Sequence, residues 1–289
     1  MKGMVDRWLT GVVLCLAGLL VVTGCSDDYM NDNAPLTGRT LKILAIGNSF
    51  TMDGIGYLPQ MIGGADINPR EVALYTATMS GASIDDWLEV YDDQRRVHLQ
   101  RELNGIRMKE RGTLQQLLAQ PWDVIVIQQS SDKSSRWETY GSLDRYMDVI
   151  KADCTNEDMH IAFQQVWSHT PKEDPDMYLG NISCSQKVGQ QIGQRWIIPS
   201  GEAIQMARCS ELNDEMYLTR DNHHLNMGIG QYIASCTWFE TLVVPVFHKT
   251  IDGCGVRPKG NDTKEEIRKA QECALAAVAS PFETIIDRR

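Results

Sequence analysis

Short apolar runs alternate with longer amphipathic segments from Leu41 onward in this chain of 289 residues. Each run has the length and the β-type composition of a buried strand, and the segments between the runs place apolar residues at helical spacing, as at Trp87, Val90 and Tyr91. Strands that are apolar on both faces need helices on both sides. The alternation therefore predicts an α/β fold, a three-layer α/β/α sandwich around a five-stranded parallel sheet. The predicted strands are residues 41–46, 72–78, 124–127, 161–166 and 196–198.

A serine directly follows the first predicted strand, in the sequence Gly47-Asn48-Ser49. Ligands of open parallel sheets bind beyond the carboxyl ends of the strands, so the Ser49 hydroxyl is expected to point into that crevice. The simpler interpretation is that Asn48 or Ser49 only caps the helix that follows. The block by itself leaves both interpretations open.

A second block, Arg220-Asp221-Asn222-His223-His224, supplies the groups that a serine nucleophile needs. A base must take the proton of the serine, and a carboxylate must orient that base; Asp221 and His224 are close enough in sequence to meet within one turn. We therefore expect Ser49 to be the nucleophile, His224 the base and Asp221 the orienting acid. The alternative is that His223 and His224 form a surface or metal-binding pair. No zinc-type spacing occurs among the 6 histidines, so no metal and no cofactor are predicted.

These blocks resemble the SGNH, or GDSL-like, hydrolases, in which the nucleophilic serine follows the first strand in a G-D-S block and Asp-x-x-His near the carboxyl end completes a triad. Here Asn48 stands in place of the usual aspartate and Phe50 in place of leucine. Together with residues 122–130 and 201–203, the blocks resemble a branch of that superfamily catalogued as a domain of unknown function in bacterial lipoproteins. The resemblance spans residues 41–244 and implies the flavodoxin-like fold and the ester chemistry of these hydrolases.

The resemblance also implies an oxyanion hole. The first two donors of the family, the amide of the serine and a glycine amide after the second strand, correspond to Ser49 and Gly81. The third donor is an asparagine side chain, but Asp132 takes that place by count, and an ionised carboxylate cannot donate a hydrogen bond. Either Gln128 or Gln129 supplies an amide N–H instead, or both glutamines only brace neighbouring loops.

The amino terminus resembles a bacterial lipoprotein signal. Two cationic residues precede an uncharged run over residues 8–24, which ends in the lipobox-like sequence Val-Thr-Gly-Cys25. We expect residues 1–24 to be a signal peptide, residues 25–40 a flexible linker lipidated at Cys25, and residues 41–289 a single hydrolase-like domain. An uncleaved transmembrane anchor is the alternative. The lipid would hold the protein to the outer membrane of the bacterial cell envelope, on its periplasmic or its outer side.

The charge balance argues against nucleic acid as a partner. The chain has 28 Lys and Arg against 38 Asp and Glu, so no cationic surplus is available to bind a phosphate backbone. Disulfides and isolated buried thiols both remain open for the cysteines beyond the lipobox. These are Cys154, Cys184, Cys209, Cys236, Cys254 and Cys273.

The sequence thus predicts an extracytoplasmic serine esterase that removes acyl groups from carbohydrate. Acetyl is the expected acyl group. The carbohydrate substrate follows from the resemblance and the lipoprotein context and not from the chemistry of any residue. Two alternatives remain: a non-catalytic glycan-binding lipoprotein with the same fold, and a lipase or thioesterase. The sequence leaves the oligomeric state open.

Overall fold

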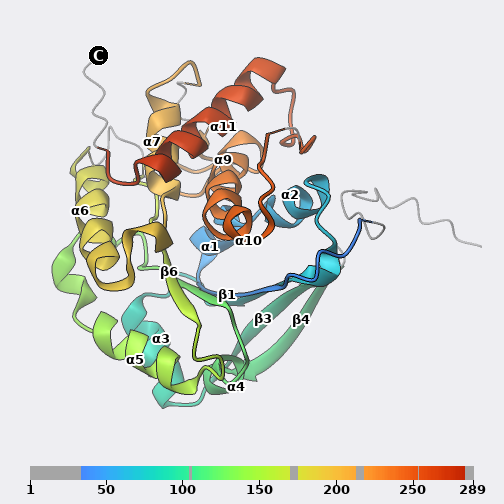
Figure 1. The fold of residues 1–289 in the computed structure, drawn as a ribbon. Coiled ribbons are helices and arrows are strands. Elements are labelled where there is room, and N and C mark those ends of the chain that lie inside the picture. The colour runs from blue at the N-terminus through green and yellow to red at the C-terminus, as the bar shows by residue number, and fades with distance from the viewer. Residues whose placement is uncertain (1–33, 104–105, 170–174, 213–217, 253, 284–289) are drawn as a thin grey trace, which may run out of the picture.

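A seven-stranded sheet forms the centre of the computed structural model, which describes residues 34–103, 106–169, 175–212, 218–252 and 254–283 (Figure 1). The strand order is β4-β3-β2-β1-β5-β6-β7. Neighbours from β2 to β7 in this order pair in parallel, which confirms the predicted parallel sheet. The parallel strands are β1 (Leu41–Gly47), β2 (Val72–Thr78), β5 (Val124–Ile127), β6 (His160–Gln164) and β7 (Ile197–Ile198).

The predicted number of strands was wrong, because an antiparallel hairpin extends the sheet beyond β2. Its strands are β3 (Arg96–Leu103) and β4 (Ile106–Thr113). Over residues 96–100, the part of β3 whose side chains are described, only Val97 and Leu99 are buried, so the segment lacks the continuous apolar run that predicts the other strands. The dipeptide Asn104-Gly105 between the two strands is a strong hairpin signal that the apolar pattern does not use.

Helices cover both faces of the sheet, as the three-layer prediction requires (Figure 1). Alternate residues of β1 show the division: Ile43 and Ala45 pack into one core cluster, whereas Leu44 and Ile46 pack into the other. The first face carries α1 (Ser49–Gly54), α2 (Leu58–Gly64), α7 (Ser200–Arg208), α9 (Ile229–Trp238) and α11 (Lys264–Ala279). The second face carries α3 (Ile84–Asp92), α4 (Leu114–Leu118), α5 (Leu143–Asp153) and α6 (Pro175–Ile192).

Shorter helical segments join these elements. A π-helical segment, Phe239–Val243, and α10 (Val244–Phe247) continue from α9. Short turns of 3₁₀ helix occur at Pro69–Glu71, Trp137–Tyr140 and Gln194–Trp196.

The chain that leads into β1 is bound to the amino-terminal edge of the sheet. The Glu71 carboxylate accepts hydrogen bonds from the amides of Thr37 and Gly38, at 2.6 and 2.8 Å. The Asn68 side chain donates to the carbonyl of Ala34 at 2.7 Å. Residues 34–40, the described part of the expected flexible linker, therefore lie against the domain. The expected signal peptide and Cys25 lie outside the described residues.

All cysteines in the described part of the chain are free thiols, so the structure contains none of the disulfides that the sequence left open among them. Four of them are buried, and two are partly buried. Across the described ranges, no helix has the length and apolar content needed to cross a bilayer. The same residues contain no cluster of His, Cys, Asp and Glu able to hold a metal ion.

Candidate active site

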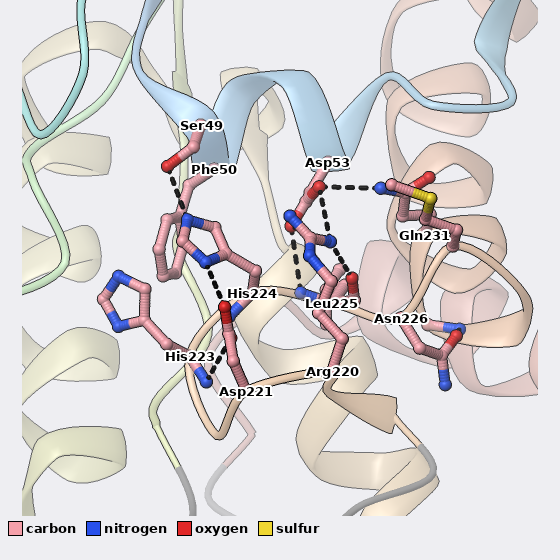
Figure 2. A network of polar contacts seen from close by, with 12 residues as sticks. Ser49, Phe50, Asp53, Arg220, Asp221, His223, His224, Leu225, Asn226 and Gln231 are labelled. Atoms are coloured by element: carbon pink, nitrogen blue, oxygen red, sulfur yellow. Dashed lines mark hydrogen bonds and ion pairs between the residues drawn. The ribbon is translucent and has the colours of Figure 1, made fainter.

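Three side chains from the two sequence blocks form a hydrogen-bonded series at the carboxyl edge of the sheet (Figure 2). The hydroxyl Oγ of Ser49, the first residue of α1, lies 2.8 Å from Nε2 of His224. The other ring nitrogen of His224, Nδ1, lies 2.8 Å from Oδ2 of Asp221. The predicted nucleophile, base and orienting acid therefore meet in the order that proton transfer requires.

The loop that carries His224 is shaped by Asp221 itself. Its Oδ1 accepts the backbone N–H groups of His223 and His224 at 3.1 and 2.6 Å, while Asn222 between them adopts a positive φ of 59°. Partial burial raises the pKa of Asp221, but the hydrogen bonds and charge of His224 outweigh this effect and lower the pKa to about 2. Asp221 is therefore ionised at neutral pH and ready to hold the imidazole.

Asn48 caps α1, and this leaves the Ser49 hydroxyl to the histidine. The Oδ1 atom of Asn48 accepts the amide of Phe50 at 2.9 Å, and its Nδ2 donates to the carbonyl of Ala82 at 3.1 Å. An aspartate has no hydrogen to give to that carbonyl, which explains why asparagine suits this position. The capping interpretation thus describes Asn48 and not Ser49.

Gly47 is needed because the chain passes very close to neighbouring side chains there. A Cβ atom at Gly47 would lie 2.1 Å from Oγ1 of Thr51 and 3.0 Å from Gln128. The absence of a side chain lets the Gln128 amide pack beneath the turn that presents Ser49. The glycine in the sequence block therefore has a packing reason.

The glutamines that follow β5 are buried and bonded to neighbouring loops. Gln128 donates to Oδ1 of Asn48 and accepts from the Thr51 hydroxyl, both at 2.6 Å. Gln129 accepts the amides of Ile84 and Ser130 and donates to the carbonyl of Thr139. Both glutamine side chains therefore hold neighbouring loops in place.

Of the two expected backbone donors, Ser49 lies at the start of α1 and Gly81 lies in the turn after β2, with a positive φ of 66°. Gly81 is exposed, and a Cβ atom there would meet nothing within 4 Å. Asp132, which takes the place of the third donor by count, is exposed as well. Its negative charge acts on the neighbouring His223.

Aromatic rings pack against the loop that carries His224. Phe50 stacks on Trp167 at 4.4 Å between ring centroids and meets His223 edge-on at 4.8 Å. The indole N–H of Trp167 donates to the His223 carbonyl at 2.8 Å. Burial, followed by the charges of His169 and His224, lowers the pKa of His223 to about 4, so this second histidine is neutral at pH 7.

One residue of the site is absent from the sequence prediction. Asp53, one helical turn after Ser49, binds Arg220 and the backbone of Leu225 on the loop that carries His224 (Figure 2). A single carboxylate inside a short helix has no motif that would reveal such a contact.

A serine, a histidine and an aspartate in hydrogen-bonded series at the carboxyl edge of an α/β sheet are an arrangement that serine hydrolases use. Residues 42–277 match the family described as "Domain of unknown function (DUF4886)", and the chain belongs to this family. The sequence comparison with curated proteins found no match.

Among solved structures, the chain is similar to a DUF4886 family protein from Bacteroides uniformis ATCC 8492, with 27% identity and a TM-score of 0.75 over 85% of this chain and 97% of that one. Two further structures are more distant. TesA has 12% identity and a TM-score of 0.45, covering 70% of this chain and 97% of its own. Axe2, an acetylxylan esterase from Geobacillus stearothermophilus, has 13% identity and a TM-score of 0.48, covering 71% and 94%.

Proposed function

We propose that this protein is a serine esterase that hydrolyses acyl esters of carbohydrate through an acyl-enzyme. The observation that carries the proposal is the series from Ser49 through His224 to Asp221, with both hydrogen bonds at 2.8 Å. Such a series makes the serine hydroxyl nucleophilic, because the imidazole can accept its proton as the new bond forms.

In the proposed reaction, Oγ of Ser49 attacks the carbonyl carbon of the ester, and its proton passes to Nε2 of His224. The amides of Ser49 and Gly81 stabilise the negative oxygen that results. The tetrahedral intermediate then expels the alcohol of the sugar, which takes the proton from His224. Water, deprotonated by His224, attacks the acyl-enzyme; the bond to Oγ of Ser49 then breaks, Oγ takes back the proton from His224, and the carboxylic acid leaves. Asp221 holds Nδ1 and stabilises the imidazolium throughout.

The position of the bound amino-terminal segment supports a carbohydrate over a membrane lipid as substrate. The contacts of Glu71 hold Thr37 and Gly38 beside the start of β2, whereas Ser49 follows the end of β1. If a lipid on Cys25 anchors the chain, the anchor joins the domain at the sheet edge opposite the site. An anchor on that side favours a polymer outside the membrane over a membrane lipid as the substrate.

The lipid anchor is part of the proposal and has its own test. Mass spectrometry of the mature protein is expected to find an acylated Cys25 at its amino terminus, and Cys25→Ala is expected to abolish this lipidation. A mature chain that starts elsewhere, with Cys25 unmodified, would contradict the anchor and the envelope location.

One observation favours a second candidate, a glycan-binding protein without catalysis. Asp132 takes the place of the third oxyanion donor, and Gln128 and Gln129 both make bracing contacts. A site with only backbone donors lacks an interaction worth ~10²–10³ in rate in other serine hydrolases.

Hydrolysis of a panel of esters separates these candidates. The full-length protein in detergent is assayed with p-nitrophenyl acetate, acetylated oligosaccharides and long-chain esters, beside Ser49→Ala. We expect release of acetate from the acetylated sugars that depends on Ser49. Equal rates for both proteins, together with equal glycan affinity, would support the binding protein instead. A preference for long acyl chains would support the lipase or thioesterase.

A further inference from the structure

The side chain of Asp53 is a buried carboxylate between α1 and the loop that carries the base. Its exposed fraction is 5%, and it follows Ser49 by one turn of the helix. We call residues 219–226 the acid–base loop; an antiparallel bridge between Thr219 and Leu225 closes it. Asp53 and Ser49 therefore project from one short helix toward the same loop (Figure 2).

Asp53 binds the acid–base loop on both sides of its functional residues. The guanidinium atom Nη1 of Arg220 lies 3.1 and 3.2 Å from the two carboxylate oxygens, immediately before Asp221. The backbone N–H of Leu225 donates to Oδ2 at 2.9 Å, immediately after His224. Arg220 also donates to the carbonyl of Leu225, so the two ends of the loop are joined to one another as well.

A third donor comes from outside the loop. Nε2 of Gln231, on α9, lies 2.7 Å from Oδ1 of Asp53. With Arg220 and Leu225, this donor satisfies the carboxylate and removes it from contact with any substrate. Burial raises the pKa of Asp53, and the charge and hydrogen bonds of Arg220 oppose that rise.

We propose that Asp53 is a positioning residue for the candidate active site: by binding both sides of the acid–base loop to α1, it sets the distance between His224 and Ser49. This inference rests on the proposed function. The path from Ser49 to His224 through this contact is short. It consists of one turn of α1, about 6 Å along the helix axis, the hydrogen bond from Leu225 to Asp53, and the single peptide link between Leu225 and His224. A displacement of about 1 Å at such a site can lower the rate by 10²-fold, so a contact this close to the base is well placed to control the rate.

Asp53→Asn tests this role with little change in shape. The amide keeps one acceptor oxygen but puts an N–H₂ group against the donors of Arg220 or Leu225, so one side of the loop loses its anchor. We expect kcat to fall by ~10–100-fold while KM changes less than about twofold, because the residue does not touch substrate. Arg220→Gln, which leaves the Leu225 contact in place, is expected to show a smaller fall of the same kind and serves if Asp53→Asn does not fold.

Gln231→Leu is the matched control. It removes a hydrogen bond from the same carboxylate, but the lost partner belongs to α9 and not to the acid–base loop. We expect kcat to stay within about twofold of wild type even where Gln231→Leu and Asp53→Asn lower the melting temperature equally. Equal losses of kcat in the two variants would overturn the positioning role and leave Asp53 a purely structural residue.

A crystal structure of Asp53→Asn separates this inference from the proposed function. The distance from Ser49 Oγ to His224 Nε2 is expected to increase beyond hydrogen-bond range. A distance retained at its wild-type value would overturn the inference. This readout needs no activity, so a wild-type protein without esterase activity would defeat the proposed function while the distance still decides the role of Asp53.

Discussion

Nε2 of His224 lies 2.8 Å from the hydroxyl of Ser49, although 175 positions separate the two residues in the chain. The contact joins the loop before α9 to the first residue of α1, and both elements lie on the same face of the sheet. Because Asp221 holds the opposite side of the ring, the orientation of the imidazole is determined from both nitrogens.

Asp221→Asn is expected to lower kcat severely, by up to ~10⁴ if this site behaves as other Ser-His-Asp sites do. An asparagine Oδ1 can still accept the amides of His223 and His224, so the loop keeps its turn. Its N–H₂ group cannot, however, accept from Nδ1 or stabilise an imidazolium. Steady-state kinetics on an acetyl ester measure the loss; a variant with more than a tenth of wild-type kcat would argue that Asp221 does not orient the base.

Substitution of either glutamine after β5 is expected to lower stability more than kcat, whereas loss of an oxyanion donor would lower kcat. Gln129→Leu leaves the buried amides of Ile84 and Ser130 without their acceptor. Each buried amide that lacks a hydrogen-bond partner lowers the stability by about 1–3 kcal/mol. We expect a lower melting temperature and a fall in kcat of less than about tenfold. Parallel kinetics on Gln128→Leu complete the comparison. If either variant loses ~10²–10³ in kcat at unchanged stability, that glutamine is the third oxyanion donor.

Gly47→Ala is expected to destabilise the protein by about 1–3 kcal/mol, because the new Cβ atom would lie 2.1 Å from Oγ1 of Thr51. Chemical denaturation measures the change. Adding Thr51→Ala should recover part of the loss by removing the clashing atom. Gly141→Ala is the control, since a Cβ atom there meets nothing within 4 Å. Equal stability of the Gly47 and Gly141 variants would refute the packing role of Gly47.

Glu202 is expected to make stability decline as the pH rises. The carboxyl group lies within hydrogen-bond distance of the Tyr178 hydroxyl, whose single proton is shared with the carbonyl of Glu283. Burial is the main cause that raises the pKa of Glu202 from 4.5 to about 8. The folded state then binds the proton more tightly than the unfolded state, so the associated stability is fully present below pH 4.5 and is lost as the pH rises through about 8.

Glu202→Gln, which mimics the protonated acid, removes this dependence. Between pH ~5 and pH ~9 the melting temperature of the wild type is expected to fall by at least ~5 °C more than that of the variant. Thermal unfolding at both pH values, in one buffer of constant ionic strength, measures the difference. Parallel curves for the two proteins would show that Glu202 is ionised in the folded state at neutral pH.

The sequence predicts the parallel sheet because its strands are apolar on both faces, and it brings Ser49, Asp221 and His224 together through their motifs. The sequence does not predict contacts between residues that belong to no local pattern. The apolar pattern does not predict the hairpin of β3 and β4, because among the described β3 side chains only Val97 and Leu99 are buried. The Asn104-Gly105 dipeptide is a turn signal and not an apolar run. The sequence does not predict the contact of Asp53 with Arg220, because the two residues are 167 positions apart and neither belongs to a periodic pattern.

Labelling by a fluorophosphonate shows whether Ser49 is an activated nucleophile, because such a probe bonds covalently to a serine that a neighbouring base has activated. Intact mass and peptide mapping of the full-length protein locate the adduct. We predict one adduct per chain, on Ser49, none on Ser49→Ala, and labelling slowed by ~10³ or more in His224→Ala. Labelling of wild type that is no faster than that of His224→Ala, or an adduct on another serine, would show that His224 does not activate Ser49.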